Sequence, residues 1–152
     1  RVGVLLVFER ETPLDEYFKT GTIVDAQLSE QLLRNLFFKN SPLHDGAVVI
    51  RGNRVTAAPC YLPLSDNMDI SKALGTRHRA AVGVSEATDS VTLVVSEETG
   101  RVSVAVSGRL KSVKDGDELR DMLSVLVKRE TENTGRFRIW KGRRRNERKA
   151  DE

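Results

Sequence analysis

The chain has 152 residues, a length typical of a single domain, and its 39% hydrophobic and 31% charged content is usual for a soluble globular protein. One cysteine, Cys60, excludes an internal disulfide, and one cysteine with two histidines argues against a structural zinc site. The longest apolar run, residues 2–8, is too short to cross a membrane, because a spanning helix takes about 20 residues.

The net charge of +3 is concentrated near the C-terminus. Residues 138–149 hold seven Lys or Arg and one Glu, whereas the rest of the chain holds 18 Lys or Arg and 21 Asp or Glu. We therefore predict a folded domain over residues 1–130 and a basic, flexible tail over residues 131–152. Nucleic-acid binding through this tail, with Phe137 and Trp140 stacking on bases, is disfavoured because the domain itself is acidic.

The first half of the chain predicts a strand, two helices and a hairpin. Residues 2–8 are continuously apolar, as in a strand that is covered on both faces. Residues 12–21 carry start and stop signals for a short helix, and Ser29 precedes a longer helix with leucines at helical spacing. Residues 47–62 form two apolar runs around Gly52-Asn53, which indicates a β-hairpin. Pro59, in the second run, favours an edge position or a local irregularity.

The second half predicts a polar loop, a helix, a second hairpin and a last helix. The first of these helices runs to about Ala87, with Thr76 as a candidate N-cap, and Gly83 within it indicates close packing. Two valine-rich strands flank the sequence EETG, and residues 115–130 follow as an amphipathic helix. This order predicts an α/β fold with a mixed, mostly antiparallel central β-sheet flanked by helices.

The sequence GTRHR, residues 75–79, places basic side chains at the start of a helix. A helix N-terminus exposes unpaired N–H groups and about half a positive charge, so it favours anions, and phosphate especially. Arg77 and Arg79 can each bind phosphate oxygens through two N–H groups, and His78 can donate to a phosphate or to a leaving group. The alternative is that these side chains are solvated and paired with nearby carboxylates, namely those of Glu86 or Asp89.

The sequence SPLHDGAVVI, residues 41–50, raises a second candidate site where a polar turn enters an apolar strand. Asp45 is either part of a tight Asp-Gly turn or a ligand for Mg²⁺ or Mn²⁺ bridging phosphates. Gly46 would allow a ligand to approach the backbone. Strand alternation turns His44 away from Asp45, so a structural role for His44 is at least as favoured as a metal-binding one.

Other nucleotide and metal motifs are absent from the sequence. There is no Gly-x-x-x-x-Gly-Lys-Ser/Thr loop, and no Gly-x-Gly-x-x-Gly follows a strand. Two histidines are too few for the His-Asp metal phosphohydrolases. Residues 96–100, with sequence SEETG, have the composition of a hairpin turn, where Glu97 and Glu98 are usually solvated.

Taken together, PLHDGAVVI, AAPCYLPLS, ISKALGTRHRAAVGVSEATDS and VVSEETG resemble the bacterial diadenylate cyclase (DAC) domain, most closely the membrane-anchored CdaA type. The resemblance covers most of residues 1–130 and includes the Asp-Gly-Ala motif, residues 45–47, and the Arg-His-Arg motif, residues 77–79. It implies that residues 1–130 form the catalytic domain, which condenses two ATP molecules into cyclic di-AMP and two pyrophosphates.

The resemblance also implies roles for single residues. Asp45 would bind the metal and activate the 3′-hydroxyl, with His44 as a possible further metal ligand. Arg77, His78 and Arg79 would hold the phosphates. The other implied nucleotide-binding residues are Gly46, Ala47, Tyr61, Leu62, Gly75, Thr76, Ser96 and Glu98, of which Tyr61 and Leu62 match positions that line an adenine pocket.

Because the product is symmetric and one site holds one ATP, we expect a homodimer with two active sites facing each other. The expected cofactor is Mg²⁺ or Mn²⁺. Regulatory proteins are further partners that the enzyme could bind. The resemblance implies that transmembrane helices precede Arg1 in the natural protein, so that this region is the cytoplasmic part of a cell-membrane protein. A catalytically silent nucleotide-binding regulatory domain of the same fold is the alternative function.

Overall fold

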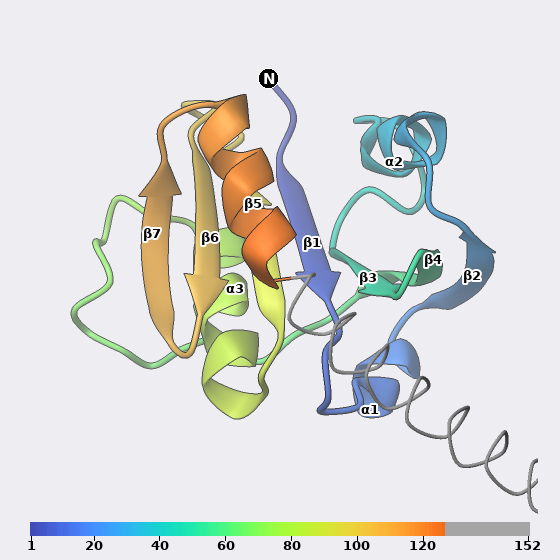
Figure 1. Cartoon of the computed structure of the whole chain (residues 1–152), viewed down its shortest axis with the longest axis horizontal. Coiled ribbons are helices and arrows are strands. Elements are labelled where there is room, and N and C mark those ends of the chain that lie inside the picture. Colours follow the sequence, from blue (N-terminus) through green and yellow to red (C-terminus); the bar gives the residue numbers. More distant parts are fainter. Residues whose placement is uncertain (127–152) are drawn as a thin grey trace, which may run out of the picture. The chain divides into compact units, whose positions relative to one another are not determined.

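The computed structural model describes residues 1–126, which comprise one unit over Arg1–Val113 and the beginning of a second unit at Lys114. The first unit is built on a seven-stranded sheet with the order β2-β4-β3-β1-β5-β6-β7 (Figure 1). The strands are β1 (Val4–Phe8), β2 (Thr22–Gln27), β3 (Ala47–Arg51), β4 (Arg54–Cys60), β5 (Val91–Val95), β6 (Val102–Val106) and β7 (Arg109–Val113).

The sheet is mixed, as the sequence predicts. β1 is its central strand and runs parallel to β3 on one side and antiparallel to β5 on the other. The remaining neighbours are antiparallel pairs. Leu5, Leu6 and Val7 are all buried, so the predicted strand covered on both faces is confirmed. The predicted fold class is therefore confirmed.

Three helices belong to the first unit: α1 (Asp15–Phe18), α2 (Glu30–Phe37) and α3 (Thr76–Ala87). Ser29 precedes α2 as predicted, and it also caps the helix, because its hydroxyl oxygen accepts a hydrogen bond from the Leu32 N–H at 3.1 Å. In the second unit residues 116–126 are helical. The Asp115 carboxylate accepts from the Glu118 N–H at 2.8 Å and begins this helix. The rest of the helix predicted over residues 115–130, and the basic tail predicted over residues 131–152, lie outside the described residues.

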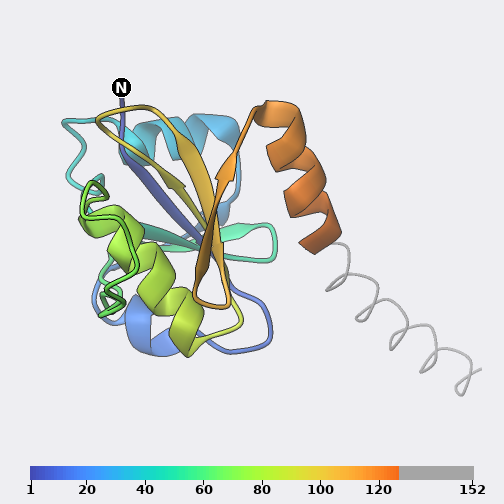
Figure 2. The same cartoon turned by 90° about the vertical axis from the view of Figure 1, so that its left-hand side faces the viewer.

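One hydrophobic cluster fills the space between the sheet and the helices α1 and α3, which lie on the same side of it (Figure 2). α3 packs across β1, β5, β6 and β7, and α1 packs against β4. The cluster joins Val7 and Val94 of the sheet with Ala81 and Val84 of α3. α3 is therefore held firmly from the side, while its first turn extends to one end of the sheet.

The hairpin β3–β4 turns at Gly52 with a φ of 61°, as the Gly-Asn dipeptide predicts. Pro59 does not lie at an edge, because β4 lies between β3 and β2. The other possibility, a local irregularity, is confirmed: the register of β4 shifts against both neighbours, and the Ala58–Pro59 peptide bond is cis.

The sequence did not predict two strands, β2 and β7, which form the two edges of the sheet. Their side chains are mostly exposed or half-buried, so neither strand carries a regular apolar face. An edge strand of this kind depends on backbone hydrogen bonds with its neighbour, and these leave little trace in the sequence.

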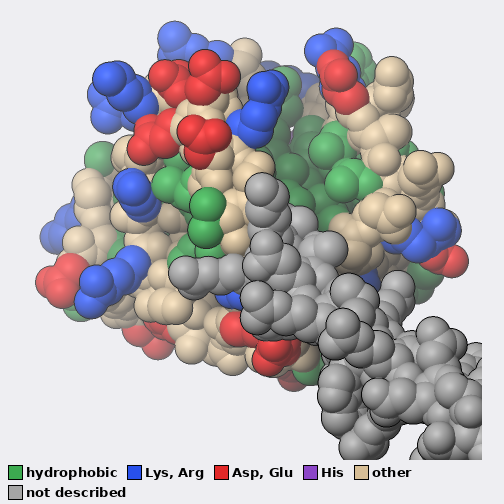
Figure 3. All heavy atoms as spheres, in the orientation of Figure 1, with side chains coloured by type: hydrophobic (Ala, Val, Ile, Leu, Met, Phe, Trp, Pro, Cys, Tyr) green, Lys and Arg blue, Asp and Glu red, His purple; other side chains and the backbone are tan. Residues whose placement is uncertain are grey.

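Acidic and basic side chains intermix over the face shown in Figure 3, and hydrophobic side chains gather between β1 and α2. The visible part of that face therefore has no large region of one charge. Within residues 1–126, no helix combines the length and the apolar content that crossing a membrane requires.

Candidate functional site

Several candidate site residues lie in segments next to one end of the sheet. The register pairs Val4 with Val95, Leu6 with Val48, and Ala47 with Cys60. The beginnings of β1 and β3 therefore lie at the same end as the last residues of β4 and β5. Residues 44–46, 61–62 and 96–98, which are far apart in the sequence, follow or precede these strand ends.

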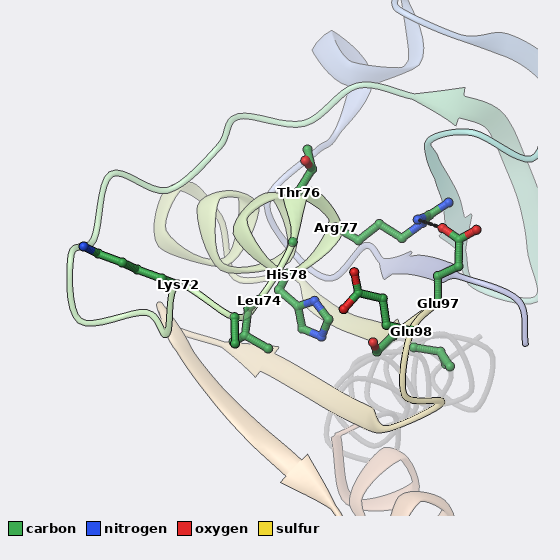
Figure 4. Close-up of a pocket in the computed structure, with 11 residues that line it drawn as sticks. Lys72, Leu74, Thr76, Arg77, His78, Glu97 and Glu98 are labelled. Atoms are coloured by element: carbon green, nitrogen blue, oxygen red, sulfur yellow. Dashed lines mark hydrogen bonds and ion pairs between the residues drawn. The ribbon is translucent and has the colours of Figure 1, made fainter.

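A pocket of about 350 Å³ opens at the first turn of α3, beside the turn between β5 and β6 (Figure 4). Its volume is within the range of small-molecule sites. Six predicted residues line it, namely Gly75, Thr76, Arg77, His78, Ser96 and Glu98. Five more lining residues were not predicted, namely Lys72, Ala73, Leu74, Val95 and Glu97.

The first turn of α3 brings unpaired backbone N–H groups to this pocket. Gly75 is the N-cap, so the prediction of Thr76 as the N-cap is wrong, and Thr76 is instead the first helical residue. Glycine has no side chain with which to satisfy the first N–H groups of the helix, and the first turn contains no acidic residue. These N–H groups and the helix dipole favour a bound anion.

Arg77 is held beside the pocket by an ion pair that the sequence did not reveal. Its Nη1 atom lies 3.1 Å from the Glu97 Oε2 atom, and its side chain is only 26% exposed. The partners considered from sequence are engaged elsewhere. Glu86 accepts a hydrogen bond from the Ser65 hydroxyl, and the Asp89 carboxylate accepts from the backbone N–H groups of residues 11 and 12.

His78 is buried at the base of the pocket, with a relative exposure of 5%. Burial lowers its pKa, and the neighbouring Arg77 charge lowers the pKa further. The imidazole is therefore neutral at pH 7, and a neutral ring offers one hydrogen-bond donor and one acceptor. Figure 4 shows that the side chains of His78 and Glu98 both project toward the pocket.

Arg79 does not line the pocket, although it belongs to the same sequence motif. Its backbone carbonyl accepts a hydrogen bond from the Ser65 N–H at 3.0 Å, which ties the segment after β4 to α3. Successive helical residues point about 100° apart, so Arg77 and Arg79 cannot both face the same point. The phosphate-binding role of Arg79 stays a prediction.

The turn before β3 holds the second cluster, outside the pocket lining. His44 closes this turn, because its N–H donates to the Ser41 carbonyl and its Nδ1 atom lies 2.7 Å from the same oxygen. This contact supports the structural role considered for His44, and its metal-binding role stays a prediction. β3 begins only at Ala47, so the turn has not ended at Asp45 and strand alternation does not apply there.

Gly46 has a φ of 144°, a conformation that side-chain-bearing residues rarely adopt. A Cβ atom at this position would lie 2.6 Å from the Pro59 Cβ atom. Close approach of β4 is thus sufficient to require glycine here, and approach of a ligand stays a prediction. Of the other predicted nucleotide-binding residues, Ala47 is fully buried, Tyr61 is 65% exposed and Leu62 packs against the core.

Asp45 is exposed, and residues 1–126 contain no group of three His, Cys, Asp or Glu side chains that could hold a metal ion by themselves. Mg²⁺ usually needs only one or two carboxylates, with water and substrate phosphates completing its coordination. A single exposed carboxylate fits that mode of binding. The metal-binding role of Asp45 stays a prediction.

Residues 1–110 match the family described as DisA bacterial checkpoint controller nucleotide-binding, or DAC. The chain is 50% identical over 145 residues to the cyclic di-AMP synthase CdaA of Bacillus subtilis (strain 168), covering 95% of this chain and 53% of that protein. It is 48% identical over 143 residues to the diadenylate cyclase of Listeria monocytogenes serotype 1/2a (strain 10403S), covering 93% and 52%. The chain thus spans about half the length of these curated relatives.

Two solved structures are similar. The crystal structure of a DacA double mutant (N166C/T172C) from Staphylococcus aureus has a TM-score of 0.79 and 50% identity, over 81% of this chain and 82% of that chain. A hypothetical membrane spanning protein from Bacillus cereus has a TM-score of 0.72 and 45% identity, over 74% and 55%. The family match covers more than half of the chain and agrees with the fold, so the chain belongs to the DAC family of nucleotide-binding domains.

Proposed function

We propose that this chain is the catalytic region of a diadenylate cyclase, which condenses two ATP molecules into cyclic di-AMP and two pyrophosphates. The observation that carries this proposal is the pocket at the start of α3, which is lined by Arg77 and neutral His78 together with Ser96 and Glu98. The relatives named as diadenylate cyclases or cyclic di-AMP synthases support it.

In the proposed reaction each 3′-hydroxyl gives its proton to the Asp45 carboxylate and attacks the α-phosphorus of the other ATP. The bond from the α-phosphorus to the oxygen bridging to the β-phosphate breaks, and pyrophosphate leaves. Such phosphoryl transfer depends on alignment and charge stabilisation rather than on covalent catalysis by the protein. Arg77 and the free N–H groups of α3 would balance the charge of the triphosphate.

His78 would act in its neutral form. A neutral imidazole can donate a hydrogen bond to a phosphate oxygen without adding a second buried positive charge beside Arg77. Ser96 and Glu98 lie across the pocket, where a hydroxyl and a carboxylate can bind the hydroxyl groups of a ribose. The pocket thus offers groups for both ends of a nucleoside phosphate.

Asp45 would hold a divalent metal, Mg²⁺ or Mn²⁺, together with the phosphates of ATP. When bound, this metal lowers the pKa of the attacking hydroxyl and stabilises negative charge on the phosphates. Asp45 lies outside the pocket that contains Arg77, at the same end of the sheet. Two chains meeting at this end would bring together two ATP molecules, as the symmetric product requires.

The direct test is to incubate the protein with ATP and Mn²⁺ or Mg²⁺ and to detect cyclic di-AMP by chromatography and mass spectrometry. We expect product that depends on the metal. If neither metal supports product formation, even at high protein concentration, the protein is not a diadenylate cyclase.

The alternative is a nucleotide-binding domain without catalytic activity. The placement of Asp45 outside the Arg77 pocket favours it, because a lone chain then binds a triphosphate without the proposed catalytic carboxylate. This domain would bind an ATP analogue, measured by calorimetry, but would release neither cyclic di-AMP nor pyrophosphate from ATP.

Replacing Asp45 by Asn tests its catalytic role. Asp45 is exposed, so Asp45→Asn should leave the melting temperature unchanged within about 2 °C. We expect cyclic di-AMP formation to fall at least about 100-fold, because the amide is a poor metal ligand and a poor base. Full activity with a normal metal dependence would exclude Asp45 from the reaction.

We further propose that the natural protein is anchored in a membrane by a segment outside this chain. The relative from Bacillus cereus that is described as membrane spanning supports this. Fractionation of cells that express the full-length protein should place it in the membrane pellet, and recovery in the soluble fraction without detergent would contradict the proposal.

A further inference from the structure

Gly3 lies directly under the guanidinium group of Arg77. It is buried and immediately precedes β1. A Cβ atom built on Gly3 would lie 2.6 Å from the Cζ atom, 2.7 Å from Nη1 and 2.8 Å from Nε of Arg77. All three distances are shorter than ordinary contacts between carbon or nitrogen atoms, so any side chain at position 3 must displace this guanidinium.

Space, rather than backbone conformation, explains a glycine at this position. Gly3 is not among the residues with positive φ, so an alanine can adopt its backbone conformation. It also differs from Gly21 and Gly83, whose Cβ atoms would meet the backbone carbonyls of Pro59 and Pro63. Those neighbours belong to fixed backbone, whereas the neighbour of Gly3 is the end of a flexible side chain.

The Arg77 side chain is therefore defined by contacts from two directions. The Glu97 carboxylate pairs with its Nη1 atom at 3.1 Å, and the backbone at Gly3 lies against the guanidinium. Both contacts come from the same end of the sheet, because Val4, next to Gly3, pairs with Val95, two residues before Glu97. Arg77 reaches this place from the first turn of α3 and lines the pocket.

We propose that Gly3 is a positioning residue, whose missing side chain leaves the space in which the Arg77 guanidinium is held ready for the phosphates of a bound nucleotide. The functional part rests on the proposed binding of ATP, whereas the contact itself does not. An arginine fixed before binding loses less conformational entropy when it binds phosphate, so its placement affects affinity and alignment.

Gly3→Ala is the matched probe, because it adds one methyl group that touches Arg77. Gly116→Ala is the control, since a Cβ atom at Gly116 meets nothing within 4 Å in the described part of the chain. The first readout needs no nucleotide: ¹H–¹⁵N NMR of the arginine Nε–H groups, with the Arg77 signal identified by its loss in Arg77→Ala. We expect this signal to shift in Gly3→Ala, and to stay unchanged in Gly116→Ala.

The second readout is the affinity for a non-reacting ATP analogue, measured by calorimetry in the presence of Mg²⁺. Arg77→Ala should weaken binding roughly 10- to 100-fold, as expected for the loss of charge-assisted hydrogen bonds. Gly3→Ala should weaken it about 5-fold or more. In the Arg77→Ala background, adding Gly3→Ala should change the affinity less than 2-fold, because both changes act through the same guanidinium.

The outcomes separate this inference from the proposed function. An unchanged Arg77 signal in Gly3→Ala, or equal losses of affinity with and without Arg77, would overturn the positioning role. Absence of cyclic di-AMP with normal binding of the analogue would overturn the proposed reaction and leave the positioning role intact. If the wild-type protein does not bind the analogue, Arg77 is not a phosphate ligand and the functional part of the inference is wrong.

Discussion

His78 is a buried basic residue beside another positive charge, and both conditions oppose its protonation. Burial keeps the ring neutral, so that it can donate one hydrogen bond and accept another in the pocket. The same burial lowers the stability of the folded protein at acidic pH. A native state that excludes a proton binds fewer protons than the unfolded chain at mildly acidic pH. The proposed role of His78 in the pocket and the pH dependence of stability therefore both depend on the lowered pKa of this residue.

We predict that stability falls as the pH drops below the ordinary histidine pKa of about 6.5. Because the folded-state pKa of His78 is lower than the unfolded-state value, the unfolded chain takes up the proton first. The contribution is fully present above about pH 6.5 and is lost as the pH falls toward the folded-state pKa. Urea unfolding between pH 5 and 8 would measure it.

The matched variant for this experiment is His78→Asn, which keeps a polar side chain without a titrating group in this range. We expect its free energy of unfolding to depend less on pH between 5 and 7 than that of the wild-type protein. Parallel pH dependences in the two proteins would show that His78 is protonated equally in the folded and unfolded states.

Contact between α3 and the segment that follows β4 is the main feature at the scale of elements. Gly83 lies against this segment, and a Cβ atom there would overlap the Pro63 carbonyl oxygen. One turn earlier the Arg79 carbonyl accepts from the Ser65 N–H, and near the end of the helix Glu86 accepts from the Ser65 hydroxyl. Residues 63–65 are thus fixed along α3, which confirms the close packing predicted for Gly83.

Gly83→Ala should therefore destabilise the protein by about 1–3 kcal/mol, as overpacked substitutions do. Helix propensity alone predicts the opposite, a gain of up to about 1 kcal/mol for replacing a helical glycine by alanine. Chemical denaturation decides between these signs, with Gly116→Ala as a control at an open position. A more stable Gly83→Ala protein would show that the segment at Pro63 yields easily.

Patterns of apolar side chains predicted most elements of the fold, but the two exposed edge strands were missed. β1, β3, β5 and α3 bury continuous or periodic apolar side chains, and such patterns are visible without a structure. β2 and β7 are mostly exposed edge strands, and Asp25 with its φ of 46° interrupts β2. Their backbone pairing depends on residues distant in the chain, which no local pattern reveals.

The same division applies to the site. The sequence predicted that the basic side chains of residues 77–79 lie at the start of α3, because charge is a local property, although it named the wrong N-cap. The role of Glu97 was missed, since a glutamate in a turn is usually solvated, and only the fold brings it to Arg77. The contact between Gly3 and Arg77 joins residues 74 positions apart and could not be predicted from either neighbourhood.

At the scale of the whole molecule, the proposed reaction needs two ATP molecules, and we expect two chains to bring them together. The pocket at α3 contains Arg77 and His78 but not Asp45, and its volume of about 350 Å³ is small for two ATP molecules. Cyclic di-AMP has two equivalent bonds between its halves, so two nucleotides must meet with opposite orientations. A two-fold pair of chains supplies that arrangement without further residues.

The rate of cyclic di-AMP formation per chain should then depend on the protein concentration. At concentrations below the dissociation constant of the pair, we predict that the cyclic di-AMP formed per chain rises in proportion to protein concentration, and that it levels off when most chains are paired. Binding of a non-reacting ATP analogue to single chains should not show this dependence, because one pocket holds one nucleotide. The measurement is a dilution series at saturating ATP and metal, with the association state followed by sedimentation velocity in the same buffer.

A constant rate per chain over a range in which sedimentation shows only monomers would mean that one chain forms both phosphodiester bonds by itself. In a membrane-anchored parent, confinement to a surface raises the local concentration of chains. Pairing at the membrane would then need less affinity than it does in dilute solution.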